Sequence, residues 1–419
     1  MEEHSKANAV ENFLVKVYMA SVCLSPLGPV VHYGLWAVCL VLMIFGRVKY
    51  GVSLRLKNLD RTGKIVLACW AALSLWTAVA GLLTFHDLNS YGRNVTIFLE
   101  VTLGMYFAAR FFIGEANRQK LLRFFVLASL LVILGNLLRE LEVIDYFPNR
   151  SLQNGNALGM LSVLLLPLCV CYAFGCVDGL VRRMVIVIPP CLAVVLSFSS
   201  GAWLAAAFSG IFLLFWCFKS KKMNFSFVAA AAFLLLCAVA VVNIRSGQNL
   251  WRRVAVEIRQ VTSFRDMGTF TTYRNEIWNA SAFLIRRRPL TGWGGKKYSR
   301  VYDELFKTQA DRLGLKNCSD ASHPHSTFLY VAYLAGLPGL ALFLTACALS
   351  LKKALRLMRV GNGHLFPWGA MFFALFSAVL VYALTGDVLT GRRDISVMLW
   401  CFWGILLILP QHGLSREKS

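Results

Sequence analysis

Two histidines that flank a single proline, His323 and His325, follow a segment rich in arginine, lysine, tryptophan and glycine. A neutral imidazole can accept the proton of a hydroxyl group, and a guanidinium can bind a phosphate through two parallel hydrogen bonds. The segment 244–322 carries fifteen Lys and Arg against seven Asp and Glu, a net charge of +8. This pattern predicts a site where a base and several cations act on a phosphate-bearing substrate.

The spacing of the residues within this segment assigns roles to particular side chains. Apolar residues at helical spacing predict a helix over about 272–287, ended by Pro289, with Arg274 near its start. Arg274 is the main candidate to bind the phosphates, and Arg288 and Lys296 are weaker ones. Pro324 suits the first turn of a helix, so His325 is predicted at its N-terminus, where the helix dipole favours a neutral ring and hence a general base. His323 is predicted to orient the site or to act in place of His325.

Two other uses of the same histidines stay open. Asp320, His323 and His325 have a spacing that zinc tolerates, although no fourth ligand is evident and the surrounding charge is positive. Both histidines could instead cap the following helix. We expect no metal and no cofactor.

The rest of the chain consists mainly of apolar runs. Of its 419 residues 58% are hydrophobic and only 15% are charged, which excludes an ordinary soluble protein. Runs long enough to cross a bilayer predict an all-α polytopic membrane protein of about twelve spans. The predicted spans are 12–27, 30–46, 65–83, 94–113, 123–139, 156–177, 184–198, 202–218, 225–243, 323–351, 365–386 and 395–410. The chain thus divides into spans 1–9 (1–243), one long loop (244–322) and spans 10–12 (323–419).

The charges of the short loops predict the orientation of the chain. Alternate loops are rich in Lys and Arg, and by the positive-inside rule these loops and both termini are cytoplasmic. The long basic loop then lies on the outer face, together with Arg93 and Arg150, two further candidates to bind phosphate. A basic surface that attracts anionic lipid headgroups is the alternative explanation of the loop's charge.

Other outer segments are expected to do less. The turn Gly292–Gly295 could let backbone amides approach a ligand. The segment 197–203 is a short connection of small residues, and the charged residues of 386–394, two arginines and two aspartates, are predicted to pair locally. Eleven of twelve cysteines lie in apolar runs, so a disulfide framework is not expected.

Several of these residues, taken in order over about 150–345, resemble the O-antigen ligase and polymerase superfamily of bacterial envelopes. They are Arg274 with Trp278, the run Pro289–Gly294, the run His325–Leu329 and the run Gly336–Gly339. The resemblance implies a C-type membrane glycosyltransferase fold in the bacterial inner membrane, with the long loop and the active site on the periplasmic face. It carries the family's loop arginine over to Arg274 and its histidine before the tenth span to His325.

The resemblance also implies the substrates. The donor would be an undecaprenyl-pyrophosphate-linked glycan and the acceptor the lipid A-core oligosaccharide, joined by an inverting, metal-independent reaction; membrane lipids are the other partners, and no nucleic acid is expected. The family often has an arginine in the small-residue turn where this chain has Ser200, and Arg150 or Arg93 could substitute for it. Two rival functions stay open: an O-antigen polymerase that acts on lipid-linked repeats, and a transporter of polyprenyl-linked glycans, which the scarcity of charges within the spans disfavours.

Overall fold

The computed structural model describes residues 2–25, 29–56, 58–140, 155–220, 255–256, 259, 273–318, 321–360, 367–389 and 392–409. All regular elements in these ranges are helices, which confirms the all-α prediction. The principal helices are α1 (Glu2–Leu24), α2 (Pro29–Tyr50), α3 (Arg61–Leu83), α4 (Leu88–Phe111), α5 (Glu115–Glu140), α6 (Gly155–Cys176), α7 (Leu180–Leu196), α8 (Ser200–Lys219), α12 (Arg274–Arg287), α13 (Tyr298–Leu313), α14 (Thr327–Val360), α15 (Trp368–Thr385) and α16 (Arg393–Ile408).

Eleven of the twelve predicted spans coincide with one of these helices, and the predicted span 225–243 lies outside the described residues. Within the described part, seven helices are long and apolar enough to cross a membrane, namely α2, α3, α5, α6, α8, α14 and α15, and α16 is a shorter apolar helix. The chain is therefore a polytopic membrane protein, while the count of twelve spans stays a prediction.

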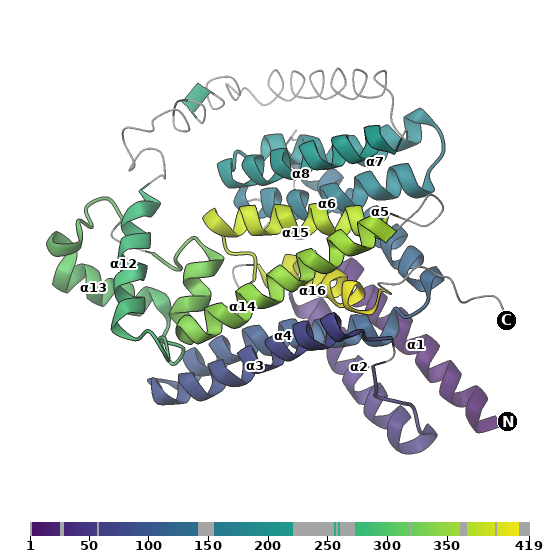
Figure 1. Ribbon diagram of the computed structural model, residues 1–419, viewed down its shortest axis with the longest axis horizontal. Coiled ribbons are helices and arrows are strands. Elements are labelled where there is room, and N and C mark those ends of the chain that lie inside the picture. Colours follow the sequence, from purple (N-terminus) through teal and green to yellow (C-terminus); the bar gives the residue numbers. More distant parts are fainter. Residues whose placement is uncertain are drawn as a thin grey trace.

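The long apolar helices run side by side in a bundle (Figure 1). Helix α3 packs against α4 and α14, α14 packs against α15, and α15 packs against α6 and α8. Helix α16 packs against α4, and its aromatic residues Trp400 and Trp403 are fully buried. The apolar faces thus join into one core, because each helix buries a stripe of large side chains against two or more neighbours.

Helices α12 and α13, which come from the long loop, gather at one end of the bundle, and α1 begins at the opposite end (Figure 1). Short turns at the α12 end join α3 to α4 and α7 to α8. The α3–α4 turn ends at Asp87, whose carboxylate accepts a hydrogen bond from the Ser90 N–H (2.7 Å) and caps α4. The segments that the sequence assigns to the outer face therefore meet at this end.

Helix α14 differs from the predicted tenth span in two ways. It begins at Thr327 and not at residue 323, so Pro324 and His325 precede it. It is also broken at Gly336, where φ is 67°. Pro338 then occupies the first turn after the break, a position where its missing N–H costs no helical hydrogen bond. The break leaves a short helix, 327–335, beneath the two histidines.

Candidate functional site

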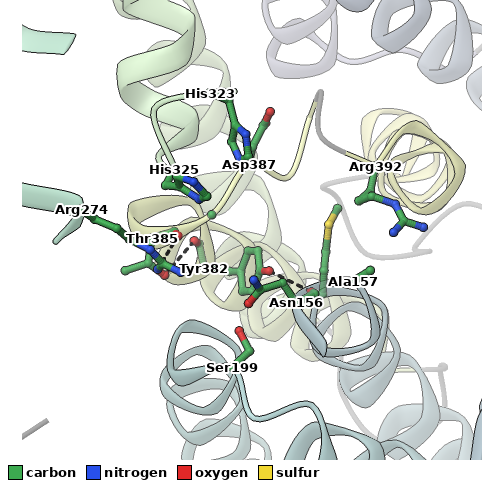
Figure 2. A pocket seen from close by; sticks show the side chains of 12 residues that line it. Asn156, Ala157, Ser199, Arg274, His323, His325, Tyr382, Thr385, Asp387 and Arg392 are labelled. Carbon is green, nitrogen blue, oxygen red and sulfur yellow. Dashed lines mark hydrogen bonds between the residues drawn. The ribbon is translucent and has the colours of Figure 1, made fainter. Parts of the chain in front are cut away.

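Arg274, His323 and His325 line one cavity of about 240 Å³ at this end of the bundle (Figure 2). The start of α6, the α7–α8 turn, α12, the segment before α14 and the α15–α16 connection all contribute to its wall. The other lining residues are Asn156, Ala157, Met160, Ser199, Tyr382, Thr385, Gly386, Asp387 and Arg392. The cavity thus assembles residues from five segments that are far apart in the sequence.

His325 lies two residues before α14 and has a left-handed backbone with φ of 53°. Its predicted place in the first helical turn is therefore wrong, although the predicted neutral ring is supported. Burial, with His323 and Arg274 nearby, lowers the pKa of His325 to about 3. Desolvation penalises the charged imidazolium, so the burial of the ring is the main cause of its lowered pKa.

His323 packs against His325, with ring centroids 4.1 Å apart. Its Nδ1 lies 2.8 Å from the Ser322 hydroxyl oxygen. Burial, together with the charge of Arg274, lowers the pKa of His323 as well. The cavity therefore holds two adjacent imidazoles that are both neutral near pH 7.

Arg274 is the first residue of α12, and its Nη1 donates a hydrogen bond to the Thr385 carbonyl oxygen (2.9 Å). This bond ties α12 to the C-terminal end of α15. It uses one of the five N–H donors that a guanidinium carries. Arg274 therefore has a fixed position in the wall of the cavity.

Backbone strain concentrates around the cavity. Among the described residues, four non-glycine residues have a positive φ: Asn58, Phe198, Tyr273 and His325. Phe198 precedes Ser199, Tyr273 precedes Arg274, and His325 lines the cavity itself. Each such conformation costs on the order of 1–3 kcal/mol and persists only where surrounding contacts enforce it, which is typical of functional sites.

A buried carboxylate fixes the segment that carries the histidines. Glu276 of α12 accepts hydrogen bonds from the N–H groups of Lys316 (2.8 Å), Asn317 (2.9 Å) and Cys318 (3.3 Å) and from the Asn317 side-chain amide (2.7 Å). Burial raises the pKa of this carboxyl, but the hydrogen bonds from Asn317, Lys316 and Cys318 outweigh it and hold the pKa below its usual value. One helix thus holds both Arg274 and the approach to His323.

Thr327 fixes the α15–α16 connection in a similar way. Its hydroxyl donates to the Gly386 carbonyl oxygen (3.0 Å) and accepts from the Val388 N–H (3.0 Å), and its own N–H also donates to Gly386 (3.0 Å). The threonine of the His325–Leu329 run therefore positions the segment that brings Asp387 and Arg392 to the cavity.

The local ion-pair cluster predicted for 386–394 is wrong for Arg393. This guanidinium pairs with Glu100 of α4 (2.7 Å) and contacts the Tyr33 hydroxyl (3.3 Å). The Arg393 pair thus joins α16 to α4 and α2, while Arg392 lies in the wall of the cavity. Asp387 is buried, and its Oδ1 accepts a hydrogen bond from the Leu389 N–H (3.1 Å).

Of the remaining predicted site residues, those that the structure describes, Arg288, Lys296 and Arg93, do not line the cavity. Arg288 and Lys296 lie over the ring of Trp293, at 4.4 Å and 5.7 Å from its centroid. The side chain of Arg93 is exposed, and its carbonyl oxygen accepts a hydrogen bond from Arg393 (3.0 Å). Arg150 lies outside the described residues.

The alternative zinc site cannot be assembled from the described residues. Asp320, its third member, lies outside them. Within the ranges that the structure covers, no group of three or more His, Cys, Asp or Glu side chains is placed to hold a metal. Eleven cysteines fall in these ranges, and none of them forms a disulfide.

The glycine turn Gly292–Gly295 contacts protein backbone and does not reach the cavity. A Cβ on Gly292 or Gly336, both of positive φ, would meet backbone atoms of the other's segment. The Trp293 N–H donates to the Tyr333 carbonyl (2.6 Å) across this contact. The turn therefore packs against the backbone of α14, where a ligand contact was predicted.

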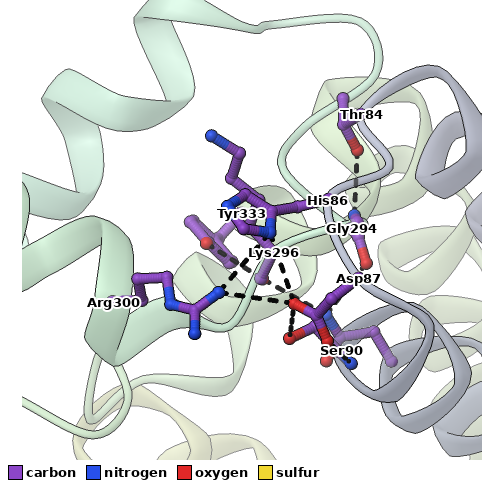
Figure 3. A network of polar contacts seen from close by, with 10 residues as sticks. Thr84, His86, Asp87, Ser90, Gly294, Lys296, Arg300 and Tyr333 are labelled. Atoms are coloured by element: carbon purple, nitrogen blue, oxygen red, sulfur yellow. Dashed lines mark hydrogen bonds and ion pairs between the residues drawn. The ribbon is translucent and has the colours of Figure 1, made fainter.

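Polar contacts hold the same turn to the α3–α4 connection (Figure 3). The Gly295 N–H donates to the Thr84 hydroxyl (2.9 Å), and the Asn94 side-chain amide donates to the carbonyl oxygens of Gly294 (2.9 Å) and Lys296 (3.3 Å). Arg300 of α13 lies 3.5 Å from Asp87. These contacts dock α12 and α13 onto the bundle and so support the cavity from a distance.

Sequence reasoning missed the contribution of Ser199, Tyr382, Asp387 and Arg392 to the cavity. Their position near helix ends was the one available signal, since each of these four residues lies within a few residues of a helix end on the predicted outer face. That signal applies equally to many residues that do not reach the cavity.

A comparison with protein families finds that residues 184–344 match a model described as O-antigen ligase. The match includes Arg274, His323 and His325, and Arg392 lies beyond it. A search of curated proteins finds none that matches the chain. Residues 184–344 are therefore similar to the O-antigen ligase family, and the long apolar helices make the chain a membrane protein.

Proposed function

We propose that the protein is an O-antigen ligase, a glycosyltransferase that moves the glycan from undecaprenyl pyrophosphate to the lipid A-core oligosaccharide. The observation that carries the proposal is the meeting of Arg274, fixed by Thr385, with the neutral ring of His325 in one cavity. A cation for the leaving group and a base for the nucleophile are the two groups that this reaction requires.

The leaving group needs charge neutralisation. In the proposed reaction the bond between the anomeric carbon of the donor sugar and the pyrophosphate oxygen breaks, and negative charge grows on the pyrophosphate. The Arg274 guanidinium would bind these oxygens and stabilise that charge, an effect that is stronger in a partly dry site. Since undecaprenyl pyrophosphate already departs as a stable anion, this scheme requires no metal.

The nucleophile needs deprotonation. The acceptor hydroxyl oxygen would form the new bond to the anomeric carbon, and its proton would pass to His325. The ring is neutral at pH 7, and the negative charge of a bound diphosphate would raise its pKa and so let it accept the proton. Single displacement from the face opposite the pyrophosphate inverts the anomeric carbon. General base catalysis of this kind contributes roughly 10²–10⁴ in rate.

His323 and the other candidate cations take secondary places in the proposal. The ring of His323, 4.1 Å from that of His325 between centroids, would orient it or bind the acceptor. Arg288 and Lys296 pack against Trp293, so we assign them to the docking of the loop. Arg93, which lies outside the cavity, and Arg150, which lies outside the described residues, remain candidates to bind the donor.

The proposed orientation puts the cavity on the periplasmic face of the inner membrane and both termini in the cytoplasm. It is supported by the charges at the other end of the bundle, where Arg47, Lys64, Lys219 and Arg359 lie close to helix ends. Under this orientation the lipid-borne donor reaches the cavity at the outer membrane boundary, and 244–322 is the periplasmic part of the chain.

Purified protein with donor and acceptor tests the proposal. We expect glycosylated lipid A-core in the presence of EDTA, and loss of that product in Arg274→Gln and His325→Ala. Lys297→Gln, which removes an exposed cation of the same loop, is the matched control. Full activity in both cavity variants would refute the site assignment.

Deletion of the gene separates the ligase from the polymerase. Loss of the polymer from lipopolysaccharide while long lipid-linked chains accumulate would support the ligase. Lipopolysaccharide capped with a single repeat would indicate the polymerase instead. Accumulation of the donor on the cytoplasmic face would indicate a transporter.

A further inference from the structure

The charge balance of the cavity depends on a residue that the family match does not include. Of the ionisable side chains in its wall, Arg274 and Arg392 are cationic and Asp387 is anionic. The low pKa values of His323 and His325 leave both rings uncharged near pH 7. Without Arg392 the charges of Arg274 and Asp387 would cancel, so the net positive charge of the wall comes from Arg392.

A diphosphate requires that charge. It brings two or more negative charges into a site whose wall is largely protein, and each buried phosphate oxygen needs a donor. The α7–α8 turn contributes only the neutral Ser199 to the wall. Arg392 is the remaining cation in the described part of the wall, after Arg274.

The surroundings of Arg392 give its backbone a fixed position. Its carbonyl oxygen accepts hydrogen bonds from the N–H groups of Ile395 (3.0 Å) and Ser396 (2.9 Å) at the start of α16. The adjacent Arg393 is bound to Glu100, which anchors the same turn to α4. Arg392 and Arg274 come from opposite sides of the cavity, with the histidines between them along one edge (Figure 2).

We propose that Arg392 is a second diphosphate-binding residue, which acts with Arg274 from the opposite wall and supplies the cation that the α7–α8 turn lacks. This inference rests on the proposed function, because it takes the diphosphate of a lipid-linked donor as the ligand. Two guanidiniums on opposite walls can each bind one phosphate group, which orients the sugar toward His325. Arg392 belongs to a segment 118 residues beyond Arg274 in the sequence, joined to it by the Arg274–Thr385 hydrogen bond.

Binding of inorganic pyrophosphate to the full-length protein in nanodiscs tests this proposal without turnover. We expect Arg392→Gln to weaken pyrophosphate binding by about 10- to 100-fold in calorimetric titrations, the range typical of a lost hydrogen bond to a charged group. Arg392→Lys keeps the positive charge but loses the planar guanidinium with its paired N–H donors. Its affinity for pyrophosphate should therefore lie between those of the wild type and Arg392→Gln. Orthophosphate has one phosphate group and would contact only one of the two guanidiniums. Arg392→Gln should therefore weaken orthophosphate binding less than pyrophosphate binding.

Matched variants separate the failure of this inference from the failure of the proposed function. Lys297→Gln should bind pyrophosphate like the wild type. Unchanged binding in Arg392→Gln, with weaker binding in Arg274→Gln, would overturn the role of Arg392 and leave the proposed function intact. Equal binding in wild type and Arg274→Gln would overturn the anion site altogether. If Arg392→Gln does not fold, Arg392→Lys decides, and a wild-type affinity of that variant for pyrophosphate would overturn the two-guanidinium arrangement.

Discussion

Two basic regions in and next to the long loop have similar composition but different surroundings. One is the wall of the cavity, with Arg274, His323 and His325. The other is the turn around Trp293, with Arg288 and Lys296 over its ring. Both combine cations with aromatic or heterocyclic rings and lie beside a short turn. In the first the polar groups surround an open volume, whereas in the second they are occupied by backbone and by one another.

The comparison shows that residue types alone do not separate a binding site from a docking contact. The glycines of the second region let two backbones approach, and its cations cover a tryptophan. The first region instead holds strained residues and half-buried imidazoles around an open volume. The predictions below test whether the two regions differ in function as they differ in structure.

The largest effect is expected for His325→Ala. Removal of the proposed base should lower kcat by roughly 10²–10⁴, with little change in folding, because the side chain is replaced at a partly open cavity. Initial rates with purified donor and acceptor measure this change. A loss of less than tenfold would assign the base to another residue, and His323→Ala is the variant to compare.

Gly292→Ala should damage the second region more than any loss of its cations. The residue has φ of 64°, and a Cβ would meet the backbone of Tyr333 and Gly336. The left-handed conformation alone costs about 1–3 kcal/mol, and the steric clash adds to it. We expect a lower Tm in detergent and weaker docking of α12 and α13. An unchanged Tm would contradict the contact between the turn and α14.

Glu276→Ala tests the support of the first region, since Glu276 accepts hydrogen bonds from the segment before His323. Its loss leaves the N–H groups of Lys316, Asn317 and Cys318 without their acceptor, which costs about 1–3 kcal/mol of local stability. Faster hydrogen exchange in 314–326 should report it, with reduced activity. Glu276→Gln retains one carbonyl acceptor and should show a smaller change. Equal exchange in wild type and Glu276→Ala would show that the contact does not hold the loop.

The pH dependence of kcat/KM reports the free state of the cavity. Because the pKa of His325 is lowered to about 3, its ring stays neutral well below the ordinary value of 6.5. In the pH profile of kcat/KM, the acidic limb due to this residue should therefore lie well below pH 6.5. In the profile of kcat, the negative charge of the bound diphosphate should move this limb to higher pH. The same shift means that the unfolded chain binds more protons, so this residue's contribution to stability is lost as pH falls from about 6.5 toward 3. A limb at or above pH 6.5 in kcat/KM would show that the ring is not desolvated in the free enzyme.

Arg288→Gln should have the smallest effect. The guanidinium covers Trp293 at the surface, where a cation–π contact is worth about 0.5–1 kcal/mol, and we expect a slight fall in Tm and activity within about threefold of the wild type. The measurements are those used for His325→Ala and Gly292→Ala. A loss as large as that of Arg274→Gln would remove the distinction between the two regions.

Parts of this arrangement could be predicted from single positions. Helix α12 begins at Arg274 and ends one residue before Arg288, close to the predicted 272–287, because apolar spacing and Pro289 define it locally. The meeting of Arg274 and His325 at one site was implied by the resemblance to the O-antigen ligase and polymerase superfamily. The start of α14 was not, because Pro324 is compatible with a helix and only the contacts of Thr327 with Gly386 and Val388 decide that the helix begins later.

The sequence by itself determined that this is an all-helical membrane protein with a basic loop, because hydropathy and charge act through composition over tens of residues. It also singled out His325 and Arg274, whose types restrict what they can do. Only the tertiary structure decided that Arg392 and Asp387 reach the cavity, that Arg288 and Lys296 do not, and that His325 is neutral through burial. These outcomes depend on where helix ends meet, which is set by packing among segments more than 100 residues apart and leaves no local pattern in the sequence.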